Sequence, residues 1–149
     1  MSVQKYYPVQ GTNKFQTVSF PMVKAFSIDF GAQAVGTDTT AQFPKGAMIL
    51  GFIARVTEAA SSAGGTATLQ IGFSGTSMLS SAIAESSLTD GAVFGANGSA
   101  PIVLSDYDTF DSIVGTEAFT SGKIDVFVLY VPLPSESLDS DNFAEYTTA

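Results

Sequence analysis

The sequence contains no cysteine, no histidine and no tryptophan. Without cysteine and histidine the chain cannot form a disulfide, a zinc site of the Cys/His type, an iron–sulfur centre or a catalytic thiol. The absence of histidine also removes every catalytic triad or dyad that depends on an imidazole base. Most familiar enzyme mechanisms are therefore excluded, and so is a small secreted scaffold held together by disulfides.

Charge is also scarce, because Asp, Glu, Lys and Arg make up 13% of the residues, where about 25% is usual. Six basic residues stand against 14 acidic ones, which gives a formal net charge of −8. Nucleic acids and anionic membranes require clustered basic residues, so neither is an expected partner. The sequence also lacks a long apolar run and a signal-peptide core near its start, so we expect a soluble chain that is not exported by the classical route.

The 149 residues match the length of one domain, and 45% of them are hydrophobic. Residues 1–22 are polar and carry lysine but no acid, which predicts an extended N-terminal arm. Residues 134–149 carry four acidic residues and no basic one, which predicts an acidic C-terminal tail. Between them, residues 23–133 are expected to form a β body. The two ends are either frayed termini or arms that reach neighbouring subunits.

Hydrophobic and polar residues alternate along this body with the period of β-strands. The predicted strands are Val23–Phe30, Ala47–Thr57, Thr66–Ser74, Gly91–Phe94, Pro101–Leu104 and Lys123–Leu133. In Ala47–Thr57 the alternation groups Leu50 with Phe52 on one face, and Ile49 with Ile53 on the other. In Lys123–Leu133 both faces are apolar, which indicates a strand covered on both sides, either within a sandwich or by another subunit.

The stretches between these strands are rich in small and polar residues and are predicted to be loops: Gly31–Thr40, Ser61–Gly65, Ala96–Ala100 and Asp106–Thr116. Apolar residues spaced three and four apart in Ser77–Ser87 predict one short helix or helical turn. The expected fold is therefore all-β: an antiparallel β-sandwich or jelly-roll-like body with one short helix and extended N- and C-terminal arms.

Three carboxylates, Asp106, Asp108 and Asp111, lie within six residues of one another and could supply oxygen ligands to Ca²⁺. They fit the EF-hand pattern only in part, because that pattern requires glycine at the position of Asp111, although Glu117 does stand at its twelfth position. A solvated acidic loop is the simpler interpretation of them. No pair of acids has the spacing or context of a catalytic dyad, so we predict no catalytic, metal or cofactor-binding residues.

Aromatic residues in the two terminal segments are the best candidates for contacts with a partner, because apolar rings on a polar arm can anchor it to another surface. The candidate interaction residues combine these rings with the lysines of the first 24 residues: Lys5, Tyr6, Tyr7, Lys14, Phe15, Lys24, Phe143 and Tyr146.

Four stretches of the body carry a resemblance to a known group of proteins. They are FPKGAMILGFIARVTEA (43–59), GGTATLQIGFSGT (64–76), SMLSSAIAESSLTDGAVFG (77–95) and SGKIDVFVLYVPL (121–133). In this pattern the sequence resembles the capsid decoration, or cement, proteins of tailed bacteriophages, including cyanophages. The resemblance covers residues 43–133 and does not extend to the terminal segments.

This resemblance implies a non-enzymatic structural protein of the virion, made in the host cytoplasm, that binds the outer capsid surface and stabilises contacts between capsomers. The implied partners are the major capsid protein and the chain itself, as a homotrimer, and no catalytic residue or cofactor is implied. The alternative is a head-fibre or tail-associated module that binds a receptor or glycan. An enzyme or an unrelated cellular β-protein is a third alternative.

Overall fold

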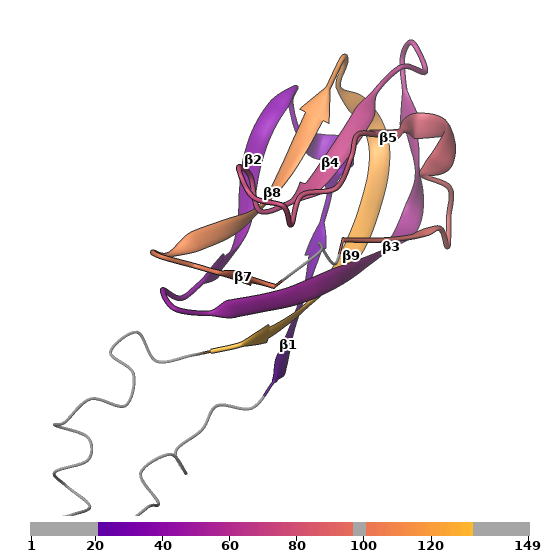
Figure 1. The fold of residues 1–149 in the computed structure, drawn as a ribbon. Coiled ribbons are helices and arrows are strands. Elements are labelled where there is room, and N and C mark those ends of the chain that lie inside the picture. The colour runs from indigo at the N-terminus through magenta and orange to yellow at the C-terminus, as the bar shows by residue number, and fades with distance from the viewer. Residues whose placement is uncertain (1–20, 97–100, 133–149) are drawn as a thin grey trace, which may run out of the picture.

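The computed structural model describes residues 21–96 and 101–132, and in these residues antiparallel strands form two sheets (Figure 1). Sheet A has the order β1-β9-β3-β6, and the short β7 also pairs with β3. Its strands are β1 (Met22–Ile28), β3 (Met48–Ser62), β6 (Val93–Ala96), β7 (Ile102–Val103) and β9 (Phe119–Val131). Sheet B has the order β2-β8-β4-β5. Its strands are β2 (Gly36–Phe43), β4 (Thr68–Gly72), β5 (Ile83–Ala84) and β8 (Asp108–Gly115).

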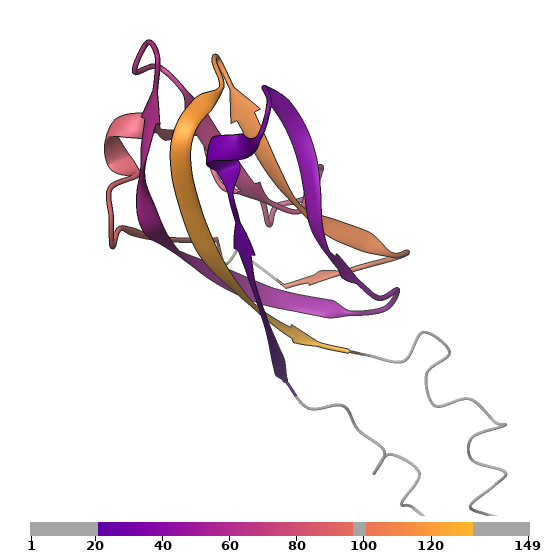
Figure 2. The same cartoon turned by 180° about the vertical axis from the view of Figure 1, so that it is seen from behind.

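The chain alternates between the two sheets in the order of a jelly roll. Among the described residues, β1, β3, β6, β7 and β9 belong to sheet A, and β2, β4, β5 and β8 belong to sheet B. The longest pairing joins β3 to β9, which curve beside each other along the length of the body (Figure 2). The predicted fold class, an antiparallel sandwich of jelly-roll type, is confirmed.

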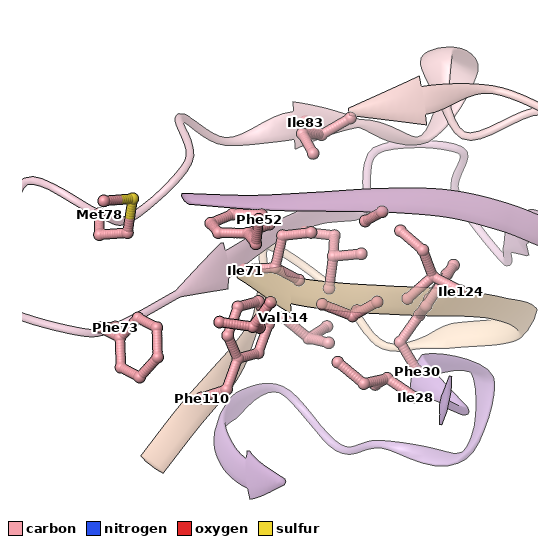
Figure 3. Close-up of a cluster of buried hydrophobic side chains, with 14 of the residues drawn as sticks. Ile28, Phe30, Phe52, Ile71, Phe73, Met78, Ile83, Phe110, Val114 and Ile124 are labelled. Carbon is pink, nitrogen blue, oxygen red and sulfur yellow. The ribbon is translucent and has the colours of Figure 1, made fainter. Parts of the chain in front are cut away.

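The core lies between the sheets and is filled by the inward-facing side chains of both (Figure 3). Phe110 of β8 is fully buried at its centre. Its ring makes edge-to-face contacts with Phe52 of β3 at 4.9 Å, Phe26 of β1 at 5.3 Å and Phe73 at 5.5 Å between centroids. Such pairs add stabilisation beyond the area they bury, so Phe110 joins the two sheets energetically as well as spatially.

The two ends of the described body lie at the same end of sheet A, because Met22 of β1 is opposite Tyr130 of β9. The predicted arm, residues 1–22, and the predicted tail, residues 134–149, fall almost entirely outside the described residues.

The prediction of a loop was wrong for two segments. Gly31–Thr40 contains the start of β2, and Asp106–Thr116 contains β8, which is a central strand of sheet B. The side chains of β2 are mostly exposed, so it has no apolar alternation to detect. In β8 a buried aspartate, Asp111, and a buried serine, Ser112, interrupt the apolar pattern.

The predicted faces of Ala47–Thr57 were also wrong at their start. The register of β3 against β9 shifts between Ile49 and Gly51, so Leu50 is an extra residue in a β-bulge. The bulge places Ile49 on the same buried face as Phe52, whereas strict alternation separates them.

The helical spacing in Ser77–Ser87 is not realised as an α-helix. The segment contains an isolated bridge at Leu79, strand β5 and the three-residue 3-10 helix η3 (Glu85–Ser87). A second 3-10 helix, η2 (Phe30–Ala32), follows β1. Within residues 21–96 and 101–132 no helix is long and apolar enough to cross a membrane.

Candidate interaction surfaces

The three clustered aspartates do not converge on a common point. Asp106 and Asp108 each accept a hydrogen bond from the backbone N–H of the next residue, at 2.7 and 2.8 Å. Asp111 is buried and accepts hydrogen bonds from the hydroxyls of Ser74, at 2.6 Å, and Thr109, at 2.8 Å. No group of three or more acidic side chains that could hold a metal ion occurs in the described part of the chain. Asp106 and Asp108 thus bond only to the next residue, and Asp111 connects β8 to the segment after β4.

Glu117, in the turn between β8 and β9, fixes the loop between β3 and β4. Its carboxylate accepts hydrogen bonds from the hydroxyl of Ser62 at 2.6 Å, and from the backbone N–H groups of Gly64 at 3.0 Å and Thr66 at 2.9 Å. These bonds, with that of the Ser62 hydroxyl first, lower the pKa of Glu117 below its usual value because they favour the charged form. The arrangement uses the carboxylate to hold a loop.

Lys24 is the one candidate interaction residue that lies in the described part of the chain. Its ammonium group donates a hydrogen bond to the carbonyl of Gln42 at 2.6 Å and lies 5.0 Å from the centre of the Phe43 ring. Because Lys24 belongs to β1 and Gln42 to β2, these contacts connect the edges of the two sheets. The other seven candidates, Lys5, Tyr6, Tyr7, Lys14, Phe15, Phe143 and Tyr146, lie outside the described residues.

An open groove of about 400 Å³ lies between the same two edge strands. Phe26 and Ile28 of β1 form its apolar side, and Asp38 and Thr40 of β2 line the other side together with Asp29. The groove is shallow and mixed in polarity, so it has no strong preference for one class of ligand.

The most unusual surface is the outer face of sheet A, which we define by the outward side chains Val23, Ala25, Ile53, Val93, Phe127 and Leu129. The strand register places them side by side. Phe127 of β9 lies between Ala25 of β1 and Ile53 of β3, and Leu129 is opposite Val23. Gly95 of β6 is opposite Ile53, and Val93 lies two residues further along β6, opposite Arg55.

These side chains are largely open to solvent: the exposed fraction is 60% for Val23, 58% for Ile53, 44% for Phe127 and 40% for Leu129. The outer face of sheet B is different, because there Ile113 is flanked by Thr37 and Gln70. Antiparallel sheets usually present polar residues to water, so a contiguous apolar face marks a surface that another molecule covers.

Comparison with known proteins finds structural relatives only. No family model matches the chain, and no curated protein matches its sequence. A chain of the cyanophage Pam1 capsid aligns with a TM-score of 0.56 and 20% identity, over 87% of this chain and 93% of that one. A chain of the Ralstonia phage GP4 capsid aligns with a TM-score of 0.54 and 18% identity, over 88% and 93%. A chain of the acidic stable capsid structure of Helicobacter pylori bacteriophage KHP30 aligns with a TM-score of 0.55 and 15% identity, over 77% and 90%.

This chain has the fold of those phage capsid chains. The alignments cover 90–93% of each of these three chains and 77–88% of this chain. At these identities the likeness concerns the fold, and the interaction residues must be argued from this chain.

Two features of the surface had only weak signals in the sequence. The two apolar faces of Lys123–Leu133 indicated that β9 is covered on both sides, but they did not identify Val23 and Ile53 as its exposed neighbours. Glu117 was noted only as part of an acidic pattern. Its role depends on the backbone N–H groups of residues 64–66, which come close to it only in the folded chain.

Proposed function

We propose that the chain is a non-enzymatic structural protein of a virion, and that it is a capsid decoration, or cement, protein. The observation that carries this proposal is the fold shared with chains of three phage capsids over at least 90% of each relative. The resemblance of residues 43–133 to decoration proteins of tailed bacteriophages supports the same function.

The charge of the chain favours the outer surface of a capsid over the inner one. Its formal net charge is −8, and the described residues carry ten acidic side chains against four basic ones. The inner surface of a filled capsid faces packaged nucleic acid, whose phosphates repel an acidic protein. A position outside the shell avoids this repulsion.

The partners in this proposal are the major capsid protein and other copies of the chain, in a homotrimer. The basic segment before β1 and the acidic segment after β9 both attach at one end of sheet A. In the proposal they extend from that end to neighbouring molecules, where Lys5, Lys14 and Lys24 meet acidic groups and Tyr6, Tyr7, Phe15, Phe143 and Tyr146 provide apolar contacts. Lys24 would have to exchange its contact with Gln42 for this role.

A reconstitution experiment tests the proposal. Purified chain is added to capsids assembled without it, and both the bound amount and the melting temperature of the capsid are measured. We expect saturable binding in a simple ratio to the major capsid protein and a higher capsid melting temperature, because a ligand of the assembled state stabilises that state. Absence of binding would overturn the proposal, and binding at only a few sites would favour the head-fibre or tail-associated alternative.

A further inference from the structure

We infer that the outer face of sheet A is where a second copy of this chain docks. The inference deepens the proposed function, because it names the surface through which copies of the decoration protein would meet. It concerns the purified chain, so its test does not require a capsid.

The first support is the arrangement of apolar side chains. Phe127 and Ile53 are directly opposite each other in the centre of the sheet, and Ala25 and Gly95 extend the same row to both neighbouring strands. Small residues on either side of a central phenylalanine and isoleucine leave those two side chains prominent. Large central apolar side chains with flat surroundings are the usual anchors of a protein interface.

The second support is the charge around this apolar row. Asp125 is opposite Arg55, and Lys123 is opposite Glu58, so the face carries two acidic and two basic side chains. The hydroxyl of Ser27 donates a hydrogen bond to Asp125 at 2.6 Å, which holds that carboxylate in the row next to Phe127 and Ile53. The outer face of sheet A is thus neutral in a strongly acidic protein.

The balanced charge of this face favours a second copy of the chain as its binding partner. Outside the four charges of the face, the described residues carry eight acidic side chains against two basic ones. Two copies of the chain therefore repel each other over most of their surfaces and can approach closely through a face whose charges balance. The terminal segments match it less well, because residues 1–20 carry only basic charges and residues 133–149 only acidic ones.

The size of the face is sufficient for a specific contact. β1, β9 and β3 over about eight residues each, together with the four residues of β6, give a projected area of about 440 Å², at about 4.8 Å between strands and about 3.3 Å per residue. Side chains add to this, and a standard interface buries about 800 Å² from each partner. The outer face of sheet A can therefore supply more than half of one side of a stable interface.

The first test measures the mass of the full chain in solution by sedimentation, for the wild type and for Phe127→Glu, Ile53→Glu and Val35→Glu. Val35 is a matched control, since it is 55% exposed but lies in the loop before β2. We expect the wild type and Val35→Glu to form an oligomer of at least twice 15.5 kDa: twice this mass where two such faces pack on each other, and three times where the face packs on a different surface of the next copy in a trimer. We expect each glutamate on the face to raise the dissociation constant at least about 30-fold, as for loss of an interface anchor. Circular dichroism verifies that each variant is folded.

A second test avoids a disruptive charge. The chain has no cysteine, so Ile53→Cys and Val35→Cys each introduce a single thiol whose alkylation rate reports its accessibility. We expect the thiol at position 53 to react at least about tenfold more slowly in the oligomer than after dilution, because an interface core excludes water, and the thiol at position 35 to show no difference. A monomeric wild type, or an oligomer that leaves position 53 fully reactive, would overturn the inference. Reconstitution on capsids by a monomeric chain would overturn it, together with the proposed homotrimer, while leaving the proposed role as a capsid decoration protein intact.

Discussion

The carboxylate of Glu117 accepts a hydrogen bond of 2.9 Å from the backbone N–H of Thr66, although the two residues are 51 positions apart. The bond closes the end of the sandwich at which β3 turns into β4 and β8 turns into β9. A charged group therefore links the two turns at this end. The stability of the body should consequently depend on the charge of one side chain.

Replacing Glu117 by glutamine should lower the melting temperature at pH 7. The folded state lowers the pKa of this carboxyl below 4.5, so its contribution to stability is present at neutral pH. It is lost as the pH falls through the lowered pKa of the folded state. Thermal melts of the wild type and Glu117→Gln from pH 7 to pH 3 should therefore converge at the acid end. Glu58→Gln, at an exposed position, is the control, and an equal gap between wild type and Glu117→Gln at every pH would contradict this account.

Gly122→Ala should destabilise the body more than Gly36→Ala. Both glycines have a positive φ, of 141° and 127°, so alanine introduces backbone strain at either position. Only at Gly122 would the added Cβ overlap a side chain, the buried ring of Phe30, whereas Gly36 faces open space. We expect a loss of about 1–3 kcal/mol at Gly36 and about 3 kcal/mol or more at Gly122, measured by chemical denaturation. Equal losses would show that the ring of Phe30 can move aside freely.

Phe110→Ala should cost about 3–5 kcal/mol of unfolding free energy, because it leaves a cavity among Phe26, Phe52 and Phe73. Urea denaturation provides the measurement. Tyr107→Ala is a suitable control, since Tyr107 lies just before β8 and is exposed. A loss below about 1 kcal/mol at Phe110 would mean that the two sheets are not held together through this ring.

Reversing the charge of the N-terminal segment should weaken capsid binding. In the proposed function Lys5 and Lys14 meet acidic groups on neighbouring molecules, so Lys5→Glu with Lys14→Glu should lower the affinity for capsids about tenfold or more at low salt. Lys45→Glu, at an exposed lysine of the body, should have little effect. Unchanged binding by the double variant, measured by co-sedimentation with capsids, would remove the N-terminal segment from the contact.

The strands that could be predicted from the sequence are those whose side chains alternate between a core and a surface. β1, β4 and β9 fall within or close to their predicted ranges, because residues such as Phe26, Leu69 and Val128 recur with a period of two. Edge strand β2 lacks this signal because most of its side chains are exposed. In β8 the alternation is obscured because Asp111 is buried, where its carboxylate accepts hydrogen bonds from the hydroxyls of Ser74 and Thr109.

The candidate surfaces were harder to predict from the sequence than the strands, because they depend on tertiary contacts. Strict alternation misplaced Ile49, since nothing in the local sequence shows that Leu50 forms a bulge. The apolar character of both faces of β9 was visible in the sequence. Its neighbours on the outer face of sheet A come from β1 and β3, and only the register of the folded sheet places Val23 beside Leu129 and Ile53 beside Phe127.

The most direct test of the proposed function is the number of copies of this chain in purified virus particles, measured by quantitative mass spectrometry against the major capsid protein. A decoration protein covers the capsid lattice, so the account predicts a ratio close to one or to a simple fraction such as one third. A handful of copies per particle would contradict it in favour of a fibre or vertex protein, and absence from the particle would exclude a role in the virion.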